Sequence, residues 1–133
     1  AVVRGIENAK KKNNKVNGTY SAWFDKGIVE GGAAAYFNGI HPTYDLHAGE
    51  SETGFGLMRY PELLDKAQIA SLKPNYEGEF LFERIGAGAK DFIECGAPDA
   101  YFGDPAAATA ENADKQYDVF SDYVVDEVRA LLG

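Results

Sequence analysis

The sequence contains a single cysteine, Cys95, among its 133 residues, so no disulfide can form within the chain. A lone thiol is typical of a reducing compartment, and we therefore expect a cytoplasmic protein. No apolar run approaches the ~18 residues that a membrane-spanning helix needs, and no signal peptide opens the chain. The sequence thus predicts neither a secreted disulfide scaffold nor a membrane protein.

Basic residues are also scarce. Lys and Arg total 13 against 21 Asp and Glu, which gives a formal charge of −8 at pH 7. Because such a surface repels phosphate backbones, we expect no nucleic-acid partner. The basic run Lys10-Lys11-Lys12 is interpreted as the solvated end of an amphipathic helix over residues 1–13, where positive charge complements the helix dipole.

Histidine is rarer still, since the only two are His41 and His47. The second of them lies in the stretch Asp45-Leu46-His47-Ala48-Gly49-Glu50-Ser51-Glu52, which also carries three carboxylates. Ala48-Gly49 is small enough for a ligand to approach the backbone. A lone histidine in a loop is more often structural than catalytic, and acids beside a helix start often only complement its dipole. Because a histidine and three carboxylates are clustered in this stretch, we take it as the candidate site.

Hydrophobic periodicity predicts a mixture of strands and helices. Period-two patterns indicate strands over residues 15–24 and 78–85, with a further short strand over 91–96. Residues 25–40 are rich in glycine and alanine and are expected to form a loop with at most one helical turn. Helices are expected over residues 52–59 and 62–67. Asp104-Pro105 has the form of a helix N-cap followed by proline at the first helical position.

The strongest periodic signal lies at the C-terminal end. From about Thr109, apolar residues recur at intervals of three and four, which predicts a long helix with one buried stripe; they are Ala113, Tyr117, Phe120, Val124, Val128 and Leu131. Such a stripe is expected to cover a sheet or a partner.

Two blocks of sequence resemble the creatininase (creatinine amidohydrolase) family. Residues 45–64, D-L-H-A-G-E-S-E-T-G-F-G-L-M-R-Y-P-E-L-L, are similar to its pattern H-A-G-x-x-E-T-S followed by a short helix and P-E-L. Downstream, Gly103-Asp104-Pro105 and Ala108-Thr109-Ala110-Glu111 are similar to its G-D-P-x-x-A-T-A-E. The family position before the histidine is often acidic, whereas here it is Leu46, and Gly54 stands where serine is usual.

The resemblance implies an α/β fold, a three-layer sandwich with a mostly parallel sheet flanked by helices on both faces. Family ligands in a Glu-x-His pair, a bridging aspartate and an N-G-H segment have no counterpart in this sequence. Residues 1–13 resemble the helix that follows the N-G-H segment. We therefore expect residues 1–133 to be the C-terminal portion of one creatininase-like domain, completed by the N-terminal half as a separate chain and inactive alone.

The same resemblance implies a metal-dependent hydrolase that holds divalent ions, two of them in the family and of the Zn, Mn or Fe type. Metal-activated water would attack a small polar cyclic compound, breaking an amide C–N bond or opening the ring of a cyclic ketone. His47 matches the catalytic histidine and Glu52 a metal-binding carboxylate. Substrate contacts are expected from Tyr44, Asp45, Trp23 and Glu50.

Two other hypotheses stay open from the sequence. One is a non-catalytic subunit or binding module that retains the fold, against which the retained His47 and Glu52 argue. The other is a stand-alone acidic α/β domain, which would require both motif blocks to match by chance. Family members assemble as homo-oligomers, often hexamers, and the apolar terminal helix is compatible with such assembly. Trp23, the only tryptophan, is equally well explained as a core aromatic.

Overall fold

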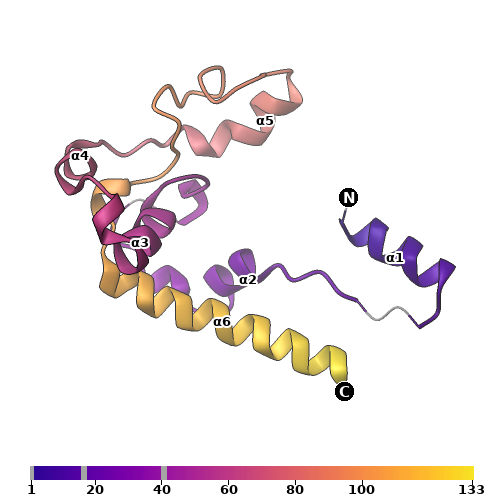
Figure 1. Ribbon diagram of the computed structural model, residues 1–133. Helices are drawn as coiled ribbons and strands as arrows, with labels where there is room; N and C mark the ends of the chain where they lie inside the picture. Colours follow the sequence, from indigo (N-terminus) through magenta and orange to yellow (C-terminus); the bar gives the residue numbers. More distant parts are fainter. Residues whose placement is uncertain (1, 16–17, 40–41) are drawn as a thin grey trace.

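A computed structural model describes residues 2–15, 18–39 and 42–133. Within these ranges the chain is built from α-helices and short 3₁₀ turns (Figure 1). The α-helices are α1 (Val2–Lys12), α2 (Trp23–Val29), α3 (Glu50–Arg59), α4 (Lys66–Ser71), α5 (Leu81–Gly86) and α6 (Ala110–Leu132). The 3₁₀ turns are η1 (Ala33–Tyr36), η2 (Pro42–Tyr44), η3 (Pro61–Leu63), η4 (Glu77–Phe80) and η5 (Pro105–Ala107).

The predicted α/β sandwich with a mostly parallel sheet is wrong. Across the described residues, β pairing is limited to two isolated bridges, His47 with Phe102 and Asn75 with Gly103. A strand needs a neighbour to satisfy its backbone N–H and C=O groups, and the segments predicted as strands do not pair with one another. Local helical hydrogen bonds satisfy those groups instead.

Each predicted strand has a local reason to fold otherwise. Residues 78–85 combine glutamate, leucine and arginine, which favour helices, and they form the end of η4 and most of α5. Residues 91–96 turn back on themselves, with the Cys95 N–H donating to the Asp91 carbonyl at 3.2 Å. Of residues 15–24, Val16 and Asn17 lie outside the described part, residues 18–22 are irregular, and Trp23 begins α2.

The expected helices at both ends of the chain are present. α6 begins after Thr109, whose side-chain oxygen accepts a hydrogen bond from the Asn112 N–H at 3.1 Å. α1 spans Val2–Lys12 and ends in the three lysines. Asp104-Pro105 opens the short turn η5 rather than α6, and the Asp104 side chain makes no capping hydrogen bond there. In the loop expected over residues 25–40, both α2 and η1 form.

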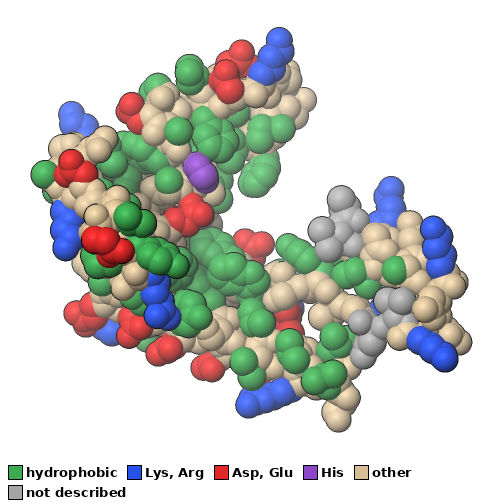
Figure 2. Space-filling view, in the orientation of Figure 1, with side chains coloured by type: hydrophobic (Ala, Val, Ile, Leu, Met, Phe, Trp, Pro, Cys, Tyr) green, Lys and Arg blue, Asp and Glu red, His purple; other side chains and the backbone are tan. Residues whose placement is uncertain are grey.

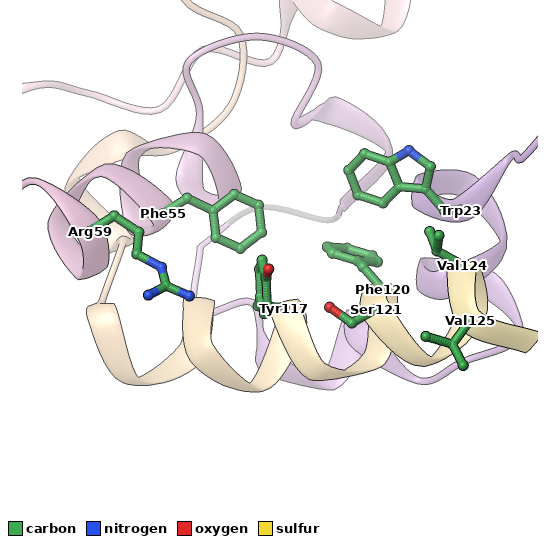
Figure 3. Close-up of a pocket in the computed structure, with 8 residues that line it drawn as sticks. All are labelled: Trp23, Phe55, Arg59, Tyr117, Phe120, Ser121, Val124 and Val125. Atoms are coloured by element: carbon green, nitrogen blue, oxygen red, sulfur yellow. The ribbon is translucent and has the colours of Figure 1, made fainter.

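The body of the fold is the crossing of α2 and α3 over α6. Gly54 allows this approach, because a Cβ there would lie 3.0 Å from the Ala113 side chain. Trp23, Phe55 and Phe120 meet edge to face on the α6 side that faces α2 and α3, with Trp23 and Phe120 ring centroids 5.1 Å apart (Figure 3). Ala113 and Phe120 are buried as the stripe predicted, whereas Val124 and Val128 are exposed.

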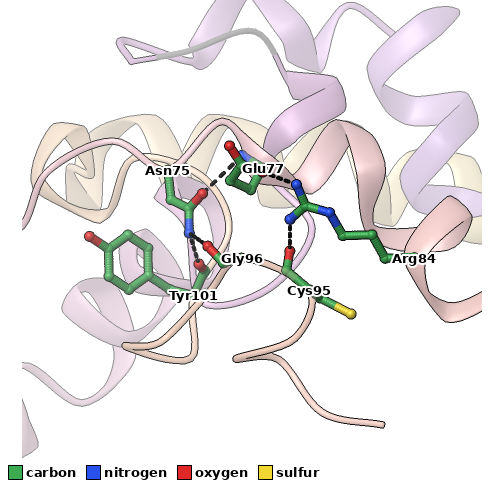
Figure 4. Close-up of polar contacts among 6 residues, drawn as sticks. All are labelled: Asn75, Glu77, Arg84, Cys95, Gly96 and Tyr101. Atoms are coloured by element: carbon green, nitrogen blue, oxygen red, sulfur yellow. Dashed lines mark hydrogen bonds and ion pairs between the residues drawn. The ribbon is translucent and has the colours of Figure 1, made fainter. Parts of the chain in front are cut away.

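A smaller apolar cluster forms within the segment between α4 and η5, from Leu81, Cys95, Ala97 and Phe102. Hydrogen bonds and an ion pair hold this segment in place (Figure 4). The Asn75 side-chain amide donates to the carbonyls of Gly96 and Tyr101 at 3.1 and 3.0 Å, and Arg84 pairs with Glu77. Buried among these groups, Cys95 is 1% exposed.

α1 stands apart from the α2–α3–α6 body and is joined to it through residues 13–22 (Figure 1, Figure 2). Of the helices that the structure describes, none is long and apolar enough to cross a membrane.

Candidate active site

The candidate site is built on the turn that leads into α3. Asp45 lies beneath this turn, 4% exposed, and its carboxylate accepts the backbone N–H groups of Glu50 at 2.5 Å and Ser51 at 3.0 Å. These are N–H groups of the first turn of α3, which have no partner within the helix. Asp45 therefore caps α3 from five residues upstream and fixes the direction in which the helix leaves the loop.

Burial raises the pKa of the Asp45 carboxyl from 3.8 to about 6. The hydrogen bonds from Ser51 and Glu50 oppose that rise, and the negative charges of Glu50 and Glu52 add to it. The site thus contains a carboxyl group that takes up a proton more readily than an exposed aspartate does.

Two glycines make room for the Asp45 carboxylate. A Cβ on Gly49 would lie 1.8 Å from Asp45 Oδ1, and one on Gly103 would lie 2.4 Å from the same atom. Gly103 also has a φ of +129°, a backbone conformation that side chains disfavour. Gly49 and Gly103 come from the two sequence blocks that resemble the family, and the fold brings those blocks into contact around Asp45.

The Glu50 side chain contacts residues 38–39, which follow η1. It is 3% exposed, and its carboxylate accepts the backbone N–H groups of Asn38 at 2.6 Å and Gly39 at 2.7 Å. Burial raises its pKa, the two hydrogen bonds lower it, and the nearby charge of Asp104 raises it further. Glu50 is therefore engaged in holding residues 38–39 against α3.

His47 and Glu52 come together on the exposed side of the turn. His47 Nδ1 lies 3.8 Å from Glu52 Oε2, with side-chain exposures of 47% and 61%. Glu52 also accepts the backbone N–H of Ala48. The His47 backbone pairs with Phe102, and its ring packs at 5.0 Å from the Phe92 ring, measured between centroids. His47 is thus held by backbone and ring contacts while its imidazole stays accessible.

His47 and Glu52 line a cavity of about 420 Å³. Asp99 is the third ionisable residue that lines it, and the apolar side chains of Leu64, Ile69 and Leu72 line it as well. The remaining lining residues are Ala48, Thr53, Gly56, Ala100, Tyr101 and Pro105. A cavity lined by both ionisable and apolar side chains suits a small organic molecule.

Sequence reasoning missed Asp99 and Tyr101 as members of this wall. Pro98-Asp99 signalled only a loop, and nothing in its local pattern indicates that residues 99–101 pack beside α3. The tertiary contact comes through the His47–Phe102 bridge.

Two alanines on the cavity wall adopt left-handed backbone conformations. Ala48 has a φ of +47° and Ala100 a φ of +60°, and each directly follows a charged or ionisable wall residue, His47 and Asp99. Non-glycine residues in this region are uncommon and cluster at functional sites, where the surrounding structure holds the strain.

Tyr44 and Trp23 lie away from the cavity. Tyr44 ends η2, and its ring meets the Tyr76 ring edge to face at 6.0 Å between centroids. Trp23 begins α2 and packs on Phe120. Of the six side chains predicted to form the site, the structure brings only His47 and Glu52 to this cavity. The other histidine, His41, lies outside the described residues.

The described residues offer too few donors for a metal. A stable site needs three or four ligands, and in the part of the chain that the structure describes no cluster of three or more His, Cys, Asp or Glu side chains could hold an ion. His47 and Glu52 supply a pair of donors, and one Glu52 oxygen already accepts the Ala48 N–H. The chain does not form a metal centre from its own described residues.

Comparison with known proteins gives one clear result. The family described as "Creatininase: Creatinine amidohydrolase" matches residues 3–128, nearly the whole chain. No curated protein and no solved structure gives a significant match. The matched range contains both sequence blocks that meet around Asp45 and the His47–Glu52 pair. The chain belongs to the creatininase family.

Proposed function

We propose that this chain carries part of the active site of a creatininase-type hydrolase, which breaks an amide C–N bond in a small polar cyclic compound. Family membership supports an amidohydrolase-type activity in general. The observation that carries the finer proposal is the pairing of His47 with Glu52 on the wall of the cavity. An accessible imidazole beside a carboxylate, in a cavity of small-molecule size, suits proton transfer to a bound substrate.

In this proposal His47 exchanges a proton with the leaving nitrogen as the amide bond breaks. Glu52 lies on the Nδ1 side of the imidazole, 3.8 Å away, which leaves Nε2 as the nitrogen to meet the substrate. The cavity wall of Leu64, Ile69 and Leu72 excludes water from the apolar side of the ring compound. Asp99 offers a carboxylate to N–H groups of the substrate.

Members of this family generally bind a divalent metal. Because the described residues of this chain form no metal centre, the proposal assigns the remaining ligands to a second polypeptide that completes the domain. A divalent ion of the Zn, Mn or Fe type would supply activated water when held in such an assembly. The cytoplasmic location and the homo-oligomeric assembly stay predictions.

The test is an assay of the complete assembly, purified with its partner polypeptide, against cyclic amides such as lactams and cyclic ureas. His47→Gln should lower kcat by about 10²-fold or more, which is the usual contribution of a general acid or base. Glu52→Gln should also lower it, whereas Glu62→Gln, an exposed carboxylate on η3 away from the cavity, serves as the matched control. Full activity of His47→Gln would contradict the proposed role of His47 in proton transfer. A wild-type assembly that binds cyclic amides without hydrolysing them would indicate a binding module.

A further inference from the structure

Two neighbouring cavities share a wall formed by Asp99 and Tyr101. The first cavity, around His47, has a volume of about 420 Å³, and the second has a volume of about 340 Å³. Among the described residues, Asp99 and Tyr101 are the two that line both cavities. A molecule bound beside His47 is therefore separated from the second cavity by this wall. The other residues that line the second cavity are Lys73, Pro74, Asn75, Tyr76, Glu77 and Pro98.

The Tyr101 side chain spans the wall. Its hydroxyl donates a hydrogen bond to the Lys73 carbonyl at 2.5 Å. Leu72 lines the first cavity, whereas Lys73 and Pro74 line the second. The phenol ring thus reaches this segment at the position where its lining changes from one cavity to the other.

Tyr101 is fixed at both ends. Its backbone carbonyl accepts a hydrogen bond from the Asn75 side-chain amide at 3.0 Å (Figure 4), and its hydroxyl is held by the Lys73 carbonyl. The next residue, Phe102, is fully buried, and its backbone N–H donates to the His47 carbonyl at 2.8 Å. The position of the phenol ring relative to His47 is therefore set by contacts within this chain, without the second polypeptide.

We propose that Tyr101 determines substrate specificity by closing the first cavity toward the second. This inference rests on the proposed function, since it concerns which cyclic amides fit beside His47. A small ring fits in a cavity of this size, whereas a bulky substituent that extends toward Asp99 meets the phenol ring. Moving that ring breaks the hydrogen bond to Lys73, which costs free energy. The site therefore selects compact cyclic amides over amides that carry a bulky group on the ring.

Tyr101→Ala opens the wall, and its effect is measured as kcat/KM of the complete assembly for compact and substituted lactams. The compact lactam is pyrrolidinone. The substituted lactams carry a benzyl group, either on the ring carbon next to the nitrogen or on the carbon after it. Wild type should prefer pyrrolidinone by about tenfold or more, and Tyr101→Ala should remove this preference, chiefly through KM. Tyr101→Leu, which is too short to reach the Lys73 carbonyl, should reduce it and replaces alanine if that variant does not fold.

Tyr76→Ala is the matched control. Tyr76 is 56% exposed and lines the second cavity but not the first. Its removal enlarges the second cavity and leaves the wall in place, so the preference for pyrrolidinone should stay as in wild type. An unchanged preference in the Tyr101 variants, or no preference in wild type, would overturn the proposal. An equal loss of preference in Tyr76→Ala would also overturn it, because the whole segment would then have loosened.

Binding separates this proposal from the proposed function. Dissociation constants for the same lactams are measured by calorimetry with assemblies that carry His47→Gln, which suppresses hydrolysis, with and without Tyr101→Ala. Selectivity that disappears with Tyr101→Ala would support the role of Tyr101 even where wild type hydrolyses no lactam. Hydrolysis by wild type without such selectivity would uphold the proposed function and overturn the role of Tyr101. Absence of pyrrolidinone binding would overturn that role as well.

Discussion

The carboxylate of Asp45 accepts the backbone N–H of Glu50 at 2.5 Å, and this bond joins the turn that leads into α3 to the first residue of that helix. Because Asp45 is buried and also holds the Ser51 N–H, Asp45→Ala would leave two backbone donors without partners. We expect a loss of about 2 kcal/mol or more in the free energy of unfolding, from the missing cap and the unsatisfied groups. Urea denaturation measures the loss.

Asp65→Ala is the matched control for that variant. Asp65 caps α4 in the same way, with Oδ1 accepting the N–H groups of Ala67 and Gln68 at 3.0 Å, but these bonds are exposed. Water can replace an exposed cap, so its removal should cost about 1 kcal/mol. Equal losses for the two variants would show that burial adds nothing at Asp45.

The raised pKa of Asp45 gives the stability a definite dependence on pH. The folded state binds the Asp45 proton more tightly than the unfolded state, since the pKa moves from 3.8 to about 6. This contribution is therefore complete below pH 4 and is lost as the pH rises through about 6. Its upper limit is roughly 3 kcal/mol, at about 1.4 kcal/mol for each pKa unit.

Asp45→Asn isolates this contribution. The difference in unfolding free energy between wild type and variant should shift in favour of the variant as the pH rises from about 4 to about 7. Glu50, whose pKa is also raised by burial, stays in both proteins, so that only its charge interaction with Asp45 enters the difference. A difference that stays constant with pH would contradict the assignment of the titration to Asp45.

Gly49 should tolerate no side chain. A Cβ there would lie 1.8 Å from Asp45 Oδ1 and 2.7 Å from the Phe102 carbonyl oxygen, so the turn or the cap must shift in Gly49→Ala. We expect a loss of about 1–3 kcal/mol or more in thermal or urea unfolding, as in other overpacked sites.

The control for Gly49 is Gly5→Ala in α1, where a Cβ would meet no atom within 4 Å. Alanine is the better helix former by roughly 1 kcal/mol, so this variant should raise the helical content measured by circular dichroism. A Gly49→Ala protein as stable as wild type would show that the turn is looser than the structure describes.

The buried Gln116 side chain connects three elements through two hydrogen bonds. Its Oε1 accepts the Ser51 hydroxyl at 2.6 Å and its Nε2 donates to the Tyr36 carbonyl at 2.9 Å, which joins α6 to α3 and η1. Gln116→Leu should cost about 1–3 kcal/mol because both partners are left unpaired. Adding Ser51→Ala should then cost less than Ser51→Ala alone, and a double-mutant cycle by urea denaturation measures this coupling. Strict additivity would argue against the bond.

The helices at the two ends of the chain could be predicted from the sequence, whereas the elements that they pack against could not. The α6 stripe has the helical period over many turns, and Thr109 marks its start with a side-chain cap. The segment over residues 78–85 is too short for its alternation to distinguish a strand from a helix, and Glu79, Glu83 and Arg84 favour the helical state. Sheet formation depends on partner strands, which no local pattern can specify.

The candidate site could likewise be predicted only in part. Proximity in the sequence was enough to bring His47 and Glu52 together, since one turn of backbone separates them. Proximity in the sequence could not show that Asp45 and Glu50 are buried while His47 and Glu52 line the cavity. That burial depends on residues 38–39 and Gly103, which lie far away in the sequence. Asp99 reaches the cavity by the same kind of long-range contact.

The most direct test of the hydrolase proposal is turnover of a cyclic amide by the complete assembly, measured beside its divalent-metal content for wild type and His47→Gln. The proposal predicts metal in both proteins, measurable hydrolysis by wild type, and a fall in kcat of about 10²-fold or more in the variant. Equal hydrolysis by both proteins would contradict the role of His47. A metal-free assembly that hydrolyses no cyclic amide would contradict the proposed function itself.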